Sequence, residues 1–166
     1  IPIAEQPKLL GKVINDKSMT QATYYFTFYL FEALKKVKEG DRFLPLLQPW
    51  QDMLDRGLST FAEQADPTRS DCHAWSASPN YELLSLVGGV RSAAPGFKKV
   101  LIEPYMGNLN TMDVTVPHPS GNIILHLDRK NNSVTGTVDL PAGITGQFNW
   151  KGKTIPLKAG SQKVSL

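Results

Sequence analysis

Two periods of apolar residues divide this chain. Between residues 22 and 87, apolar side chains recur at the three- and four-residue spacing of helices. After residue 97 they alternate with polar ones at the two-residue spacing of strands. The stretch Ala93-Ala94-Pro95-Gly96 lies between the two patterns and reads as a linker. The pattern predicts a helical domain over residues 1–96 and a domain of strands over residues 97–166.

The helical part is expected to begin with a lead-in, Ile1 to Lys17, that contains Pro2, Pro7 and Gly11, and to continue with a long first helix. Ser18-Met19-Thr20-Gln21 reads as a capping box, and the helix then runs to about Lys38 and is ended by Gly40. The residues that keep helical spacing are Ala22, Tyr25, Phe26, Tyr29, Leu30, Ala33, Leu34 and Val37, with Phe28 and Phe31 off that face. A helix that is apolar on nearly all sides needs cover on all sides. We therefore expect that part of its natural packing is missing and that the uncovered face favours self-association.

Two shorter helices and an irregular segment are expected to follow. Pro49 sits where a helix start tolerates its missing N–H, and Gly57 closes that helix. Residues 58–78 are polar and irregular. Ser78-Pro79 begins the third helix, for which a start near Trp75 is also possible, and Gly88-Gly89 stops it.

The second half is expected to form an antiparallel β-sandwich, because short strands follow one another at close, regular spacing. The glycine- and asparagine-containing pairs Ser120-Gly121, Asn131-Asn132 and Lys151-Gly152 read as turns. The expected strands are Val100–Glu103, Met112–Val116, Asn122–Leu127, Ser133–Leu140, Gly146–Trp150, Thr154–Leu157 and Gln162–Leu166.

Composition narrows the function classes. The net charge is +3, and the basic excess lies in residues 98–166, where 8 Lys and Arg face 4 Asp and Glu. These cations are scattered over strand edges and turns without interleaved aromatics, so we expect no nucleic-acid partner. No apolar run is long enough to span a membrane, so we expect no membrane partner. One Cys excludes an internal disulfide and a cysteine-based zinc site.

The start of the chain bears on its origin. It begins at Ile1, without Met and without a basic-then-apolar leader. We expect an excised fragment of a longer protein. The cellular location of the parent cannot be read from the fragment, and we favour a periplasmic or secreted location over a cytoplasmic one.

The candidate chemistry lies in residues 59–79. Glu63 is either a solvated surface charge or a carboxylate placed to take a proton. His73 either hydrogen-bonds a helix end or holds a sugar hydroxyl or a carboxylate. Trp75 is either a stacking platform for a sugar ring or a core residue. Cys72 and His73 are adjacent, and adjacent side chains generally point apart, so we expect no nucleophilic Cys–His pair. We expect Cys72 to be a buried thiol without a catalytic role.

These residues carry a resemblance to a known family. The motifs Ser59-Thr60-Phe61-x-Glu63 and Ser70-x-Cys72-His73-Ala74-Trp75-Ser76-x-x-Pro79 resemble the closing portion of bacterial α-L-rhamnosidases, which are six-hairpin glycosidases. The further motifs that fit are Ala22-Thr23-x-Tyr25-Phe26, Glu32-Ala33-Leu34, Phe43-Leu44-Pro45-Leu46-Leu47, Leu83-Leu84, Gly88-Gly89-Val90 and Ala94-Pro95-Gly96-Phe97. The resemblance covers nearly the whole chain, and the β half matches mainly by strand pattern.

The resemblance implies both a fold and an activity. The fold is the last helices of an (α/α) six-hairpin toroid, followed by an antiparallel β-sandwich. The family hydrolyses terminal α-L-rhamnosyl groups with inversion and needs no metal or organic cofactor. Glu63 matches the family's general base, and His73 matches a histidine that contacts rhamnose. The implied partners are a rhamnose-containing glycan or glycoside and the upstream remainder of the polypeptide, which carries the general acid, so the isolated chain is expected to be inactive.

Two departures from the family pattern put substrate preference in question. Ala62 stands before the matched Glu63, where the family often has Trp, and the spacing from Glu63 to His73 is shorter than in many relatives. Two rival readings also stay open. In the first, the sandwich is the functional part of a carbohydrate-binding or structural module, and Phe148 and Trp150, which share one strand face, are its candidate aromatic residues. In the second, the toroid belongs to another glycosidase or to a lyase, and Arg69 is the one candidate cation to neutralise the carboxylate of a lyase substrate.

Overall fold

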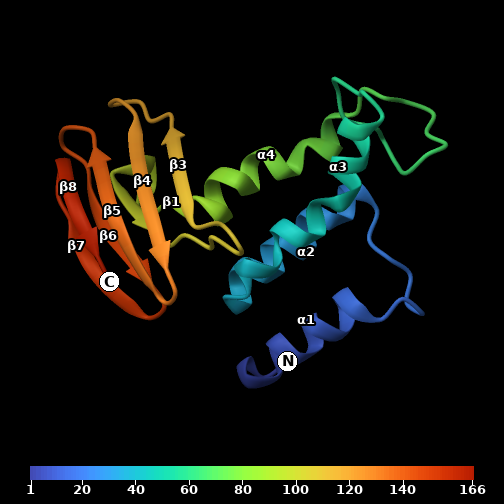
Figure 1. The fold of residues 1–166 in the computed structure, drawn as a ribbon, viewed down its shortest axis with the longest axis horizontal. Helices are drawn as coiled ribbons and strands as arrows, with labels where there is room; N and C mark the ends of the chain where they lie inside the picture. Colours follow the sequence, from blue (N-terminus) through green and yellow to red (C-terminus); the bar gives the residue numbers. More distant parts are fainter. The chain divides into compact units, whose positions relative to one another are not determined.

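The computed structural model describes residues 1–166, which divide into two compact units, Ile1–Glu82 and Leu83–Leu166. The first unit is helical and the second holds all the strands (Figure 1). Helices followed by a sandwich of two sheets is the fold class that the sequence predicted. The domain boundary expected between residues 96 and 97 stays a prediction. None of the helices has the length and apolarity needed to cross a lipid bilayer.

The first unit contains one helix that the sequence pattern did not predict. Its helices are α1 (Gln6–Asn15), α2 (Tyr24–Val37), α3 (Gln48–Asp55) and α4 (Ser78–Glu82), with 3₁₀ turns at Ile3–Glu5, Gly40–Arg42, Leu44–Leu47 and Ala74–Ala77. The lead-in expected over Ile1 to Lys17 therefore contains a helix, α1. Pro7 lies in the first turn of α1, where a missing N–H costs nothing, so it begins this helix instead of preventing it.

The long helix α2 begins and ends differently from the prediction. The Thr23 side chain caps its first turn by accepting a hydrogen bond from the Phe26 amide. The residues of the expected capping box serve the preceding turn instead, since the Ser18 hydroxyl donates to Asp16 Oδ1 and the Gln21 amide donates to the Asp16 carbonyl. At the other end, Lys38 adopts the left-handed conformation that terminates the helix.

The buried face of α2 also differs from the prediction. Its buried residues are Thr27, Phe31, Leu34 and Lys35. The aromatic side chains of Tyr25, Phe26 and Tyr29, which were assigned to the apolar face, are 42–57% exposed. The expectation of an uncovered apolar face on this helix is thus confirmed, on the side opposite to Phe31. Self-association through it stays a prediction.

The core of the helical unit forms around two phenylalanines and a tryptophan. The rings of Phe31 and Phe43 meet edge to face with centroids 4.6 Å apart, and Trp50 lies 6.0 Å from Phe31. The Trp50 indole donates a 2.7 Å hydrogen bond to the Ser76 carbonyl. This bond ties α3 to the turn before α4, at the end of the loop that carries the candidate residues.

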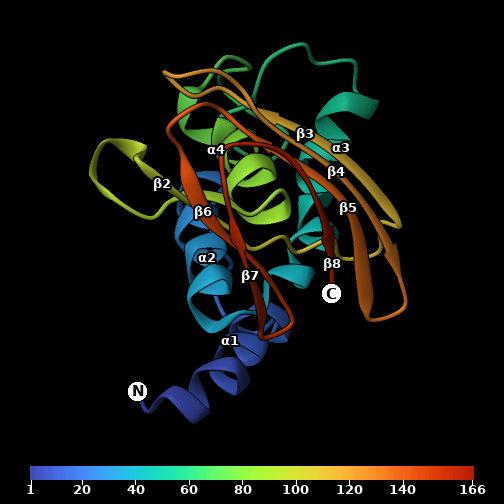
Figure 2. The ribbon, with the colours of Figure 1, turned by 90° about the vertical axis from the view of Figure 1, so that its left-hand side faces the viewer.

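The second unit opens with a π-helical turn, Leu83–Val87, that continues α4. Its strands form two four-stranded sheets, ordered β1-β2-β6-β7 and β3-β4-β5-β8, which Figure 2 shows as separate layers. The strands are β1 (Val90–Ser92), β2 (Lys99–Ile102), β3 (Thr111–Val116), β4 (Ile123–Lys130), β5 (Ser133–Leu140), β6 (Thr145–Trp150), β7 (Lys153–Leu157) and β8 (Gly160–Ser165). All seven expected strands are present, and β1 is an eighth.

Pairing within the sheets is antiparallel except between β2 and β6, which run parallel. The predicted antiparallel sandwich is thus confirmed with one parallel pair, which arises because β2 and β6 are joined through β3, β4 and β5 of the other sheet and not by a hairpin. Phe148 and Trp150 are both buried in the sandwich core. The turn Lys151-Gly152 has positive φ at both residues, as a tight two-residue hairpin requires.

Candidate functional site

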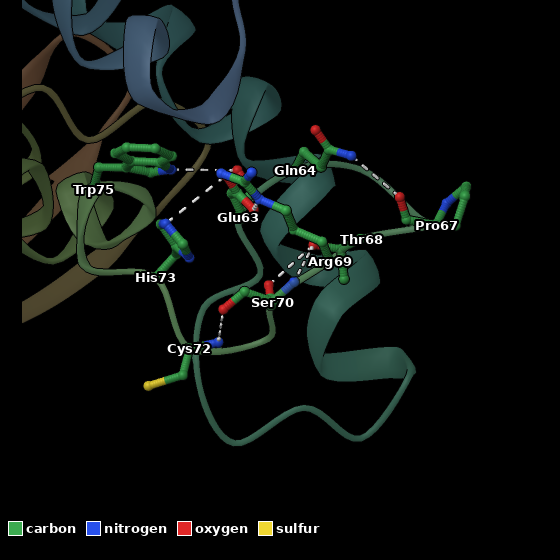
Figure 3. Close-up of polar contacts among 9 residues, drawn as sticks. All are labelled: Glu63, Gln64, Pro67, Thr68, Arg69, Ser70, Cys72, His73 and Trp75. Carbon is green, nitrogen blue, oxygen red and sulfur yellow. Dashed lines mark hydrogen bonds and ion pairs between the residues drawn. The ribbon is translucent and has the colours of Figure 1, made fainter.

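The candidate residues lie on a loop that is closed by its own backbone. The Glu63 amide donates to the Ser70 carbonyl, and the His73 amide donates to the Phe61 carbonyl, each at 2.8 Å. The Thr60 hydroxyl adds a bond to the Asp71 carbonyl. These bonds hold the segments 60–63 and 70–73 side by side, so that Glu63 and His73 face each other although they are ten positions apart in the sequence (Figure 3).

Glu63 is a nearly buried carboxylate with a charged partner. Its side chain is 7% exposed, and both of its oxygens accept hydrogen bonds from Arg69, at 2.6 Å from Nε to Oε2 and 2.5 Å from Nη2 to Oε1. These bonds hold the pKa of the Glu63 carboxyl below its ordinary value. Burial acts in the opposite direction and is outweighed, and the charges of Arg69 and His73 lower the pKa further. Glu63 is therefore ionised at neutral pH.

His73 and Trp75 lie on the other side of the same carboxylate. His73 Nε2 is 3.8 Å from Glu63 Oε1, and the His73 and Trp75 rings have centroids 4.4 Å apart. The Trp75 indole donates a 3.4 Å hydrogen bond to the Glu63 carbonyl. The Nδ1 atom of His73 is buried and has no hydrogen-bond partner. An unsatisfied buried nitrogen is unfavourable unless a ligand or water supplies its partner.

The three site residues predicted from the sequence, Glu63, His73 and Trp75, are thus brought together, while their roles stay predictions. Trp75 is 43% exposed, which excludes the alternative that it is a core residue. Its ring lies 5.6 Å from that of Tyr25, the exposed aromatic residue on α2.

The prediction for Cys72 was wrong in one respect. Cys72 is exposed, not buried, because it lies on the polar, irregular loop and not on the packed face of a helix. Figure 3 shows the sulfur extending away from His73, so the expected absence of a Cys–His pair agrees with the geometry.

Arg69 is the site residue that sequence reasoning missed as a partner of Glu63. It was considered only as an isolated cation for a different reaction. The spacing of six residues has no meaning on an irregular loop, so no periodicity could connect the two. The available signal was the single basic residue between Glu63 and His73.

No group of three His, Cys, Asp or Glu side chains in the chain is arranged to hold a metal ion.

Comparison with known proteins gives a consistent result. Residues 89–163 match the family model of the bacterial alpha-L-rhamnosidase C-terminal domain. No curated protein matches the chain. Among solved structures, an α-L-rhamnosidase from Aspergillus terreus has a TM-score of 0.83 at 17% identity, over 99% of this chain and 21% of that one.

Two bacterial enzymes extend the comparison. An α-L-rhamnosidase from Streptomyces avermitilis, solved with L-rhamnose, has a TM-score of 0.81 at 15% identity, over 99% of this chain and 20% of that one. A GH78 family rhamnosidase from Bacillus sp. GL1 has a TM-score of 0.76 at 26% identity, over 86% of this chain and 17% of that one. The chain thus spans about a fifth of the length of these enzymes. The resemblance seen in the sequence motifs is confirmed: residues 89–163 match the C-terminal domain model of the bacterial alpha-L-rhamnosidases, and the chain has the fold of the corresponding part of these solved rhamnosidases.

Proposed function

We propose that this chain is part of an inverting glycoside hydrolase that releases terminal α-L-rhamnose from rhamnosides, with Glu63 as its general base. The observation that carries the proposal is a nearly buried, ionised carboxylate flanked by an imidazole and an exposed indole, on a chain that has the α-L-rhamnosidase fold. A general base must be deprotonated to act, and the lowered pKa of Glu63 keeps it so.

In the proposed reaction, Glu63 removes a proton from a water molecule as that water attacks the anomeric carbon. The proton moves to the Glu63 carboxylate, and a carboxylic acid on the opposite side protonates the departing glycosidic oxygen. Inverting enzymes hold the two carboxyl groups roughly 6.5–9.5 Å apart so that the water fits between base and sugar. We assign the acid to a part of the enzyme outside this chain, and we therefore propose that the chain alone is inactive.

The neighbours of Glu63 would hold the sugar. The His73 side chain, which is 28% exposed and lies beside Glu63, offers an imidazole for a hydrogen bond with a sugar hydroxyl. The exposed Trp75 ring offers an apolar face against which a pyranose ring packs. The enzyme's substrate would be a rhamnose-containing glycan or glycoside. We favour the periplasm or the cell exterior as the location of the enzyme.

The test uses the full-length enzyme that contains this chain. Glu63→Gln keeps the size of the side chain and removes its basicity. We expect hydrolysis of an aryl α-L-rhamnoside to fall by about 100-fold or more, because general-base catalysis contributes on the order of 10² to 10⁴. The matched control is Glu39→Gln, since Glu39 also pairs with an arginine, Arg42, at 2.9 Å. Near-normal turnover by Glu63→Gln would reject the assignment.

The readings as a carbohydrate-binding module and as a lyase gain no support. A carbohydrate-binding sheet face needs exposed aromatic residues, whereas Phe148 and Trp150 are buried and no aromatic side chain of Leu83–Leu166 is fully exposed. A lyase needs a cation free to neutralise a substrate carboxylate. The candidate for that role, Arg69, is bound to Glu63 through both oxygens.

A further inference from the structure

We propose that Arg69 is the positioning residue of the general base, which holds the Glu63 carboxylate in a fixed orientation for proton transfer. The inference rests on the proposed function, because positioning has a meaning only if Glu63 takes a proton. It also extends that function, since the family resemblance pointed to Glu63 and His73 and gave Arg69 no part in the reaction.

The first support is the geometry of the contact. Two neighbouring nitrogens of the flat guanidinium donate to the two oxygens of the flat carboxylate, at 2.6 and 2.5 Å. Such a paired contact fixes both the distance between the two groups and the rotation of the carboxylate about its last bond. A single hydrogen bond or a lysine ammonium would leave that rotation free.

The second support is that the loop builds the contact into its backbone. Ser70, the residue after Arg69, accepts the hydrogen bond from the Glu63 amide, so the main chains of the two partners are joined next to their side chains (Figure 3). The Thr68 hydroxyl donates to the Ser70 carbonyl at 2.9 Å and accepts from the Ser70 amide at 3.3 Å. The path of residues 68–70 is therefore held on both sides of Arg69.

The third support is the contrast in exposure between the two partners. The Glu63 side chain is 7% exposed and that of Arg69 is 78% exposed. A nearly buried carboxylate needs a charged partner, and here that partner is a side chain that itself stays largely in solvent. Each carboxylate oxygen has two lone pairs, and Arg69 occupies one on each. The remaining lone pairs can accept a proton from a water while the carboxylate stays in place.

The contact has two separable effects on the proposed reaction. The positive charge favours the ionised form of Glu63, which is also faced by His73 Nε2 at 3.8 Å. The paired hydrogen bonds fix its orientation. The rate rises with pH as Glu63 loses its proton, so removal of the charge raises its pKa and moves this acid limb to higher pH. Loss of orientation lowers the rate at every pH.

The experiment compares Arg69→Gln and Arg69→Lys in the full-length enzyme, with an aryl α-L-rhamnoside as substrate. For Arg69→Gln we expect the acid limb of kcat/KM to move to higher pH and kcat on the plateau to fall by up to about 100-fold, the cost of a misplaced catalytic group. Arg69→Lys keeps the charge, so its acid limb stays near that of the wild type while the plateau falls. The control is Arg56→Gln, because Arg56 pairs with the exposed Asp66 at 2.9 Å and should leave the profile unchanged.

The outcomes separate this inference from the proposed function. If Glu63→Gln abolishes turnover and Arg69→Gln keeps the wild-type plateau and acid limb, the role of Arg69 is rejected and the function stands. If Glu63→Gln remains active, the function itself is rejected. A titration of the Glu63 carboxyl carbon by NMR in the 166-residue chain needs no activity. An unchanged Glu63 pKa in Arg69→Gln would show that the paired contact with Arg69 is not made in solution, and it would overturn the inference on that ground.

Discussion

At the scale of the residue, the ion pair between Lys35 and Glu82 is the most buried charged contact in the helical unit. Lys35 Nζ lies 2.8 Å from Glu82 Oε2, and the two side chains are 6% and 0% exposed. The ammonium also contacts Glu32 at 2.5 Å and lies over the Tyr81 ring at 4.5 Å. Burial on its own lowers the pKa of Lys35, but the hydrogen bonds that its ammonium donates to Glu32 and Glu82 outweigh burial, and the pKa is raised. The pair therefore joins α2 to α4 as a charged contact at neutral pH.

Lys35→Met is expected to lower the free energy of unfolding by about 3 to 5 kcal/mol, because it takes this cation from the buried Glu82 carboxylate. Because the pKa of Lys35 is raised in the folded state, its contribution to stability is complete below the unfolded pKa of roughly 10.4 and is lost as the pH rises through the folded pKa. Urea unfolding at pH 7 therefore measures this contribution in full.

Lys36→Met, at the exposed neighbouring position, serves as the control. Lys35→Met combined with Glu82→Met should recover to within about 1 kcal/mol of the wild type. A loss below about 1 kcal/mol for Lys35→Met would contradict the importance of the pair.

At the scale of the element, the parallel pair of β2 and β6 depends on a glycine. Gly146 is the register partner of Val100, and a Cβ atom at residue 146 would lie 2.2 Å from the Val100 carbonyl oxygen. The contact is with backbone, which cannot move aside as a flexible side chain can. We expect Gly146→Ala to force the strands apart and to cost at least about 2 kcal/mol of unfolding free energy, as overpacking does.

Urea unfolding followed by circular dichroism measures this cost. Gly152→Asn is the control, since Gly152 has φ +84°, has open space around it, and asparagine tolerates that conformation. It should stay within about 1 kcal/mol of the wild type. Equal losses of unfolding free energy for the two variants would show that the close approach of Gly146 to the Val100 carbonyl does not determine the stability of the β2–β6 pair.

The sequence predicted elements well where one period of apolar residues dominates. Each of the seven expected strands is present, and Ser133–Leu140 has the predicted bounds. The short strand β1 was missed because three residues are too few to show alternation. The buried face of α2 was wrong because a helix that is apolar all round offers no contrast by which to choose a face. The partner strand of β2 was not predictable either, since the two strands of a parallel pair are distant in sequence.

The candidate site shows the same division between local and distant information. Glu63, His73 and Trp75 were found through motifs, which are local strings of residues. Their proximity in the structure depends on hydrogen bonds between segments 60–63 and 70–73, and no pattern of residues in the sequence predicts these bonds. The Arg69 contact follows from that pairing and became visible only with the backbone path.

At the scale of the whole molecule, the two units differ in how much apolar core they contain. Seven hydrophobic side chains are buried in Ile1–Glu82 and nineteen in Leu83–Leu166, although the units are nearly equal in length. The helical unit also exposes Tyr25, Phe26 and Tyr29. A small core gives low stability because burial of apolar surface must offset the conformational entropy of the chain. This imbalance agrees with the proposal that the helices are the closing part of a larger toroid.

We therefore expect the two units of the isolated chain to unfold separately, with the helical unit first. Amide hydrogen exchange read by mass spectrometry in increasing urea reports on both units in one sample, without substitutions. Peptides from α2 and α3 should lose protection at a lower urea concentration than peptides from β4 and β5, because the sandwich buries more apolar surface per residue. Lys35→Met should lower the midpoint of the helical peptides alone, and Gly146→Ala that of the sandwich peptides alone. A single midpoint common to all peptides, shifted equally by either variant, would show that the chain unfolds as one cooperative unit despite the difference between its cores.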